Sequence, residues 1–251
     1  MADLAGLGAY IARDVGAHAN AGEHARVALA AAAAAGDIAI GAHTIARMAG
    51  HKIELRQPAE ALALLDAAQR QANHLLTPGD RANQACIRAW AHAQMGAADE
   101  MHRAIDSAED AFVTAPSIPS AAWAAQHVTE AELYSLTGAA YVDLARRDSS
   151  HAQVAIDRLT RAIELRRESV ARNRVLDQIS LAQALVRGAE PGEAGRVALR
   201  ALTDRVGIAS RRLDNRFNEL AAELRPHRRQ DTSVMEFLEQ RQVVRSEASG
   251  L

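Results

Sequence analysis

Two tryptophans are the side chains best suited to contact an apolar ligand in this chain of 251 residues, because only 3% of its residues are aromatic. Trp90 stands among alanines, and Trp123 follows two prolines and precedes His127 and Glu130 at helical spacing. An indole offers a broad apolar face and one N–H donor, while the imidazole and the carboxylate add polar contacts. We therefore expect Trp90, Trp123, His127 and Glu130 to contact a ligand.

Motifs for other chemistry are missing. None of the ten histidines has the two-His, one-Glu spacing of a zinc-binding helix. The sequence has neither a glycine-rich phosphate loop followed by lysine nor a Gly-x-Ser-x-Gly elbow. The single cysteine, Cys86, rules out an internal disulfide, and its helical surroundings predict a small buried hydrophobe. We expect no metal, no cofactor and no catalytic residue, with an unrecognised helical-repeat biosynthetic enzyme as an alternative.

The composition predicts an all-α fold. Alanine makes up close to a quarter of the residues, and alanine is the best helix former, whereas sheets are rich in aromatic and β-branched residues. No apolar run approaches the length of a membrane span, so we expect no membrane contact. A single cysteine fits a reducing compartment, and we therefore expect a cytoplasmic location. The formal net charge of -2 argues against a nucleic-acid coat, which needs a basic surface.

Prolines and glycines divide the chain into apolar-periodic stretches. Proline costs about 3 kcal/mol inside a helix, so all six prolines are interpreted as element ends, and Gly22 and Gly36 as breaks between helices. The pattern predicts helices over 4–20, 22–35, 38–56, 58–75, 80–95, 98–114, 120–146, 149–167, 169–187, 191–206, 209–224 and 231–245.

A spacing of small residues recurs in the second helix of each predicted pair. An alanine is followed four residues later by an apolar residue and three further on by another alanine, which puts all three on one helical stripe. The five instances are Ala25/Leu29/Ala32, Ala61/Leu65/Ala68, Ala104/Ala108/Ala111, Ala155/Leu159/Ala162 and Ala194/Ala198/Ala201. We expect these stripes to be buried where helices approach closely.

The segment from Tyr134 to Tyr141 resembles the first-helix signature of the tetratricopeptide repeat, with Thr137 where leucine is usual. Pro116 ends the preceding repeat at the spacing where that family has its closing proline. Successive alanine stripes begin 36, 43, 51 and 39 residues apart, against about 34 in the standard repeat. The resemblance implies a right-handed solenoid of about five helix pairs over 1–206, with capping helices and a tail over 207–251.

Four short sequence segments, taken in their order along the chain, resemble the C-terminal sensor region of helix-turn-helix transcriptional regulators from high-GC Gram-positive bacteria. They occupy 59–66, 88–93, 129–138 and 225–229. This resemblance implies a regulatory or sensor protein. A DNA-binding domain normally precedes the repeats in such regulators, and here Met1 stands almost directly before the first repeat-like helix. We therefore expect contact with DNA only through an N-terminal domain absent from this sequence.

The tetratricopeptide resemblance also implies a ligand face. First helices line the concave surface of such stacks. Laying the signature on this chain places further candidate ligand contacts on that surface: Tyr10, Asp14, His43, Glu54, Glu132, Asp143, Gln183 and Arg187. Their mixed charges suit a peptide, a small effector or a protein partner, and a homodimer is also compatible with the sequence.

The arginine-rich C-terminal third offers a second alternative, nucleic-acid binding through its helices. Glu219 and Glu223 lie on the same predicted helix as Arg212 and Arg216, which favours pairing within the helix. The apolar segment 234–238 is expected to cap the last repeat or to form a dimer contact.

Overall fold

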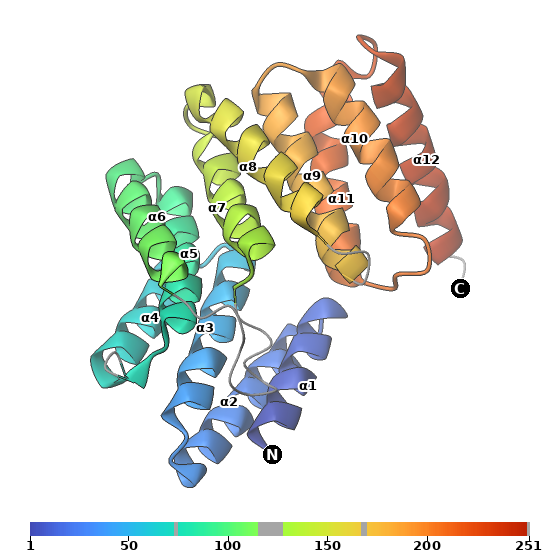
Figure 1. Cartoon of the computed structure of the whole chain (residues 1–251). Coiled ribbons are helices and arrows are strands. Elements are labelled where there is room, and N and C mark those ends of the chain that lie inside the picture. Colours follow the sequence, from blue (N-terminus) through green and yellow to red (C-terminus); the bar gives the residue numbers. More distant parts are fainter. Residues whose placement is uncertain (73–74, 115–127, 167–169, 250–251) are drawn as a thin grey trace. The chain divides into compact units, whose positions relative to one another are not determined.

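The structure is a computed structural model that describes residues 1–72, 75–114, 128–166 and 170–249, and it is all-α throughout these ranges (Figure 1). The described ranges contain twelve α-helices: α1 (Ala2–Asp14), α2 (His18–Ala35), α3 (Ile38–Glu54), α4 (Pro58–Ala72), α5 (Pro78–Met95), α6 (Ala98–Val113), α7 (Glu130–Leu144), α8 (Ala152–Leu165), α9 (Ala171–Arg187), α10 (Pro191–Asp204), α11 (Arg211–Leu224) and α12 (Thr232–Ser249). The predicted all-α class is confirmed. None of the described helices combines the length and apolar character needed to cross a bilayer.

Local signals explain where several helices begin. Proline is the first residue of α4, α5 and α10, a position where its missing N–H costs nothing. Thr77 and Asp80 form a reciprocal capping box before α5, in which the Thr77 hydroxyl accepts from the Asp80 N–H at 3.1 Å. Asp37 caps α3 by accepting from the Ile40 N–H at 3.0 Å. These caps fix the helix starts within a residue or two of the predicted positions.

The predicted first break was wrong. Helix α1 ends at Asp14 and α2 begins at His18, so the predicted helix 4–20 is divided and Gly22 lies inside α2. Gly16, between the two helices, has a φ of +79°, which glycine adopts without steric cost. A single glycine lowers the stability of a helix by only about 1 kcal/mol relative to alanine. The alanine-rich residues around Gly22 favour the helix enough for it to continue past this position.

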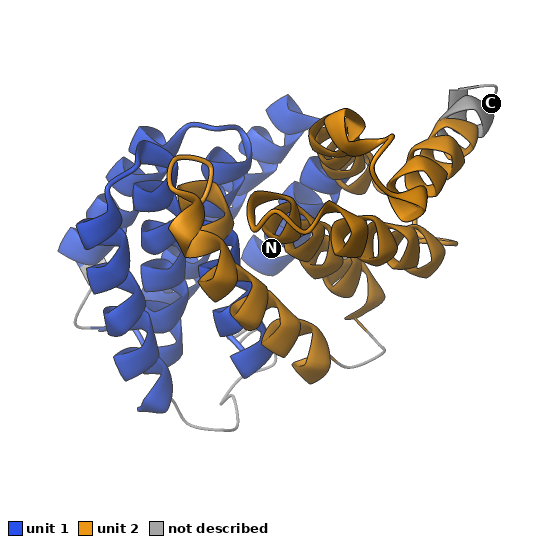
Figure 2. Cartoon of the chain, turned by 90° about the horizontal axis from the view of Figure 1, so that it is seen from above, with its two compact units in different colours: residues 1–140 blue, residues 141–251 orange. Residues whose placement is uncertain are grey.

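The chain forms two compact units, residues 1–140 and 141–251, with the boundary inside α7 (Figure 2). In unit 1 the closest packing joins α1 to α2, α3 to α4 and α5 to α6. Helix α3 also contacts α1, α2 and α5. Ile53, Leu65 and Ile87 from α3, α4 and α5 meet in one buried cluster, which ties the central helices together.

Unit 2 is built around α9, which packs against α8, α10 and α11, while α12 packs against α10. Its core includes Leu213, Phe217, Leu224 and Phe237, and the two phenylalanine ring centroids are 6.5 Å apart. Residues Val234 and Phe237 are fully buried in this core. The segment 234–238 therefore packs onto the helices before it.

The five alanine stripes lie on α2, α4, α6, α8 and α10, as predicted, and their burial is confirmed. In α8 and α10 all three positions of the stripe are 0% exposed, and in α4 none exceeds 1%. Leu29 and Ala111 are the partly buried members. Small side chains at these positions allow the neighbouring helices to approach closely, so the alanine excess serves packing as well as helix formation.

Candidate functional site

Side chains from α1 and α3 form a polar cluster in unit 1. Arg13 Nε donates to Glu54 Oε2, and the guanidinium forms an ion pair with Oε1 of the same carboxylate; the two side chains are 16% and 18% exposed. The Arg47 guanidinium lies over the Tyr10 ring, 5.2 Å from its centroid. Asp14, the residue that follows Arg13 in the sequence, is also buried. The structure thus brings the predicted residues Tyr10 and Glu54 together and adds two arginines that the prediction missed.

Electrostatics at this cluster follow from partial burial. Burial disfavours the charge of Arg13, but attraction to Glu54 and smaller contributions from Tyr10 and Asp14 outweigh it, so the pKa of Arg13 is raised. Burial, followed by the nearby Arg13 charge, lowers the pKa of His51 to about 4. The His51 ring is therefore neutral at pH 7, and its Nε2 is 3.0 Å from Nδ1 of His18.

An apolar stripe runs along α1 to its C-cap, Val15, beside this cluster. Leu4, Leu7, Ile11 and Val15 are 70%, 50%, 53% and 52% exposed and recur every three or four residues. On a helix, residues three and four apart are neighbours, so Leu7 borders both Tyr10 and Ile11. We call the surface formed by Leu7, Tyr10 and Ile11 of α1, with Arg47 and Glu54 of α3, the first-helix face. Predicted residue His43 lies on α3 one turn before Arg47 and is partly buried.

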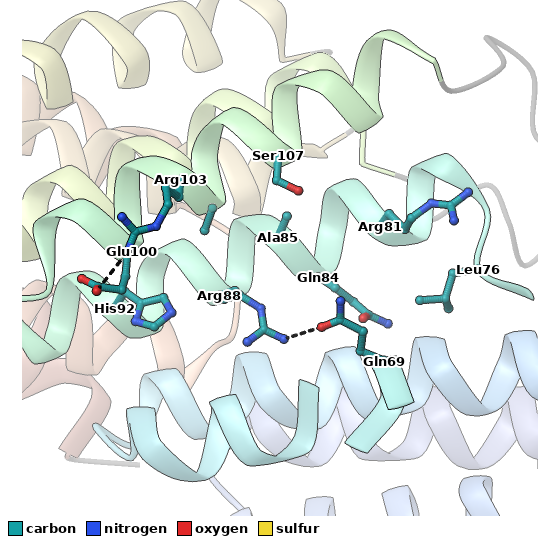
Figure 3. A pocket seen from close by; sticks show the side chains of 11 residues that line it. Gln69, Leu76, Arg81, Gln84, Ala85, Arg88, His92, Glu100, Arg103 and Ser107 are labelled. Atoms are coloured by element: carbon teal, nitrogen blue, oxygen red, sulfur yellow. Dashed lines mark hydrogen bonds and ion pairs between the residues drawn. The ribbon is translucent and has the colours of Figure 1, made fainter. Parts of the chain in front are cut away.

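A cavity of about 430 Å³ lies over α5, between residues of α4 and α6 (Figure 3). Its α5 wall carries Arg81, Gln84, Arg88 and His92, spaced so that they follow one face of the helix. Gln69 of α4 and Arg103 of α6 line it from either side. Sequence reasoning missed this cavity, although the polar stripe along 81–92 is the pattern that would have indicated it.

Two arginines of the cavity wall are held by surface carboxylates. Arg88 donates to Asp66 at 2.7 Å and to Gln69 at 3.3 Å, and Arg103 donates to Glu100 at 3.0 Å. The Asp66 and Glu100 side chains are 45% and 47% exposed, so these ion pairs are weak and the carboxylates are free to exchange with solvent. Burial, then the charge of Arg88, lowers the pKa of His92.

In unit 2 three predicted residues gather around Glu223 of α11. Glu223 Oε1 accepts from Gln183 at 3.0 Å, from Arg187 at 3.0 Å and from Arg146 at 3.3 Å. Asp143 accepts from Arg146 at 3.0 Å, which links α7 to the network. Gln183 is fully buried, so here its carboxamide faces protein groups and not solvent.

The other predicted residues lie apart from these clusters. Trp90 of α5 is partly buried and packs against the core cluster around Ile53. Glu132 completes a capping box at the start of α7, where it accepts from the Thr129 N–H at 3.1 Å, and Glu130 beside it is exposed. Trp123 and His127 lie outside the described residues.

Several arginines of the C-terminal third are paired with carboxylates. Arg205 contacts Asp214 at 2.6 Å, and Arg216 contacts Glu219 of its own helix at 3.2 Å. Arg216 also donates to the Gln183 carbonyl oxygen, Oε1, at 2.9 Å. These contacts lie within and between helices of unit 2. They agree with the prediction that the arginines of the C-terminal third pair with carboxylates of the chain, which the sequence favoured over binding to nucleic-acid phosphates.

Comparison with known proteins gave no match to a family model, to a curated protein or to a solved structure.

Proposed function

We propose that the chain is a tetratricopeptide-like binding module without catalytic activity, which binds a peptide segment of a partner protein on the first-helix face of unit 1. The sequence resemblance to tetratricopeptide repeats and to the sensor regions of helix-turn-helix regulators supports this proposal. The packing supports it as well, because α3 contacts α1 and α5 in addition to its own partner α4. First helices that lie next to one another are what a stack of helix pairs requires.

The observation that carries the proposal is the apolar stripe of α1 beside the Tyr10–Arg47 stack. Contiguous exposed apolar side chains on a helix mark interaction surfaces in folded proteins. Leu7 and Ile11 are about half exposed, so covering each would contribute on the order of 1 kcal/mol. Tyr10 adds a large side chain with two rotatable angles, which loses little entropy on binding.

The polar part of the face defines which peptide fits. The Arg47 guanidinium over the Tyr10 ring could contact a peptide carboxylate in addition to its contacts within the chain, whereas Arg13 forms an ion pair with Glu54. An apolar peptide residue would pack on Leu7 and Ile11 while an acidic residue or the C-terminal carboxylate meets Arg47. In a sensor, such binding changes the arrangement of the module only if the peptide prefers one arrangement to another.

Panning a library of random 12-residue peptides on the full chain, followed by fluorescence-anisotropy titration of the selected peptides, tests the proposal. We expect peptides that combine apolar residues with a carboxylate and bind with Kd of about 10 µM or tighter. Tyr10→Ala and Arg47→Gln should each weaken binding at least about tenfold. Arg26→Gln, which removes an exposed arginine of α2, should leave it unchanged. Failure to enrich any peptide, or full binding by both face variants, would refute the proposal.

A further inference from the structure

The cavity over α5 is a second site, distinct from the first-helix face and independent of the function proposed for it. It lies within unit 1 and is lined by α4, α5 and α6, whereas the first-helix face belongs to α1 and α3. Its volume of about 430 Å³ falls in the range of sites for small molecules, about 300–1,000 Å³. The chemistry of its walls defines which small molecule fits.

The charged side chains of the cavity wall are mostly basic. Arg81, Arg88 and Arg103 line it with Glu100 as the acidic member, so the lining carries a formal charge of +2. Arg88 uses two of its N–H groups on Asp66 and Gln69, and a guanidinium has five. An incoming anion could therefore bind Arg88 without displacing these contacts, and could exchange with the exposed carboxylate of Glu100 on Arg103.

Gln84 is the independent indication that the cavity takes a ligand. Its side chain lines the cavity, and the residue is only 7% exposed. Among the described residues its Nε2 has no hydrogen-bond partner. Leaving a buried amide donor unpaired destabilises a fold, so such groups are rare in the absence of a ligand or an ordered water. An acceptor atom in the cavity would satisfy it.

The cavity also has an apolar part. Leu76, Ala85 and Ala104 contribute to its lining and are themselves buried. A ligand that fills the cavity must then offer hydrogen-bond acceptors and negative charge toward α5 and α6, and a carbon skeleton toward these three side chains. Inorganic phosphate would supply the acceptors and the negative charge but would leave the apolar side chains without a contact.

We propose that this cavity binds a small organic anion, a carboxylate or phosphate monoester, with its anionic group between Arg88 and Arg103 and an acceptor atom on Gln84 Nε2. Bidentate contact with guanidinium groups is the geometry that arginine offers to carboxylate and phosphate oxygens. The apolar residues then receive the organic part of the ligand.

Titration of the full chain with phenyl phosphate, benzoate, inorganic phosphate and benzyl alcohol tests the proposal, with ¹H–¹⁵N spectra of the Gln84 carboxamide and the arginine Nε–Hε groups as readout. We expect saturable shifts with at least one of the two aromatic anions at Kd of about 1 mM or tighter. Inorganic phosphate should bind more weakly than phenyl phosphate, and benzyl alcohol should not bind. Equal binding of the neutral alcohol, or no shift with either aromatic anion, would overturn the proposal.

Variants separate the site from general attraction to a basic surface. Arg88→Gln and Arg103→Gln should each weaken the bound anion at least tenfold, which corresponds to about 1.4 kcal/mol. Arg26→Gln removes the same charge from α2 and should not change the affinity. Gln84→Met keeps an unbranched side chain of similar size and should weaken binding while the chain stays folded by circular dichroism. Unchanged affinity in Arg88→Gln and Gln84→Met, with both folded, would overturn the assignment.

Discussion

Replacing Glu223 by glutamine should destabilise unit 2 much more than a surface substitution does. The Oε1 atom of Glu223 accepts hydrogen bonds from Gln183, Arg187 and Arg146, and the side chain is 22% exposed. Glutamine keeps the shape and an acceptor oxygen but removes the charge. Burial lowers the pKa of Arg187 and attraction to Glu223 opposes this effect, so the variant leaves a buried guanidinium without its main counterion.

The magnitude follows from the bonds. A hydrogen bond to a charged group contributes about 1.5–3 kcal/mol and a neutral one about 0.5–1.5, so each of the three bonds loses about 1 kcal/mol. The contact with Arg146 is the longest, at 3.3 Å, and that side chain is 38% exposed, so its loss counts less. We expect Glu223→Gln to lower the free energy of unfolding by about 2–3 kcal/mol.

Urea denaturation followed by circular dichroism measures this difference, and hydrogen exchange of the α9 and α11 amides locates it. Glu219→Gln on the same helix is the matched control, because Glu219 is 47% exposed and pairs with Arg216 across one turn. That control should cost about 0.5 kcal/mol or less. If the two variants differ by less than about 0.5 kcal/mol, the network around Glu223 does not stabilise unit 2 as argued.

Three further predictions concern stability. Gln84→Met should raise the free energy of unfolding by about 1 kcal/mol in urea, because it removes an unpaired buried amide; a loss of stability would contradict this. The pKa of His51 is about 4 in the folded chain and about 6.5 in the unfolded chain. Because the unfolded state therefore binds the proton more readily between these values, the stability conferred by the neutral ring is complete above pH 6.5 and is lost as the pH falls toward 4. Allowing for its partial exposure, we expect about 1–2 kcal/mol in pH-dependent urea titrations, and His51→Gln should flatten this part of the profile. Gly195→Ala should lower the free energy of unfolding measured in thermal melts by about 1–3 kcal/mol. The reason is that the new Cβ would lie 2.6 Å from Ser233 Oγ and 2.7 Å from the backbone nitrogen of Val234. The control for Gly195→Ala is Gly50→Ala, whose Cβ would meet only Ile87 at 3.9 Å and which should be neutral or stabilising.

Most of the fold was predictable because its signals are local. Proline at helix starts and the four-then-three alanine spacing act within one or two turns, and both match the described helices and their buried faces. The error at Gly16 and Gly22 has the same origin. Both are glycines in an alanine-rich stretch, and only tertiary packing decides which one adopts a positive φ.

The sites were less predictable because their contacts join distant segments. Arg13 meets Glu54 across 41 residues, and Arg187 meets Glu223 across 36. The repeat resemblance placed Tyr10 and Glu54 on neighbouring first helices, but no spacing in the sequence indicates the arginines that pair with them. The cavity over α5 is lined by residues of three helices. The polar stripe from Arg81 to His92 could therefore predict only the wall that α5 contributes.

Hydrogen exchange of the full chain with and without a selected peptide tests the central claim, peptide binding on the first-helix face, most directly. Protection should rise in α1 and α3, which carry Leu7, Tyr10, Ile11 and Arg47, and Arg47→Gln should remove this increase. Protection confined to α9–α12, or unchanged exchange in α1 and α3 at saturating peptide, would contradict it.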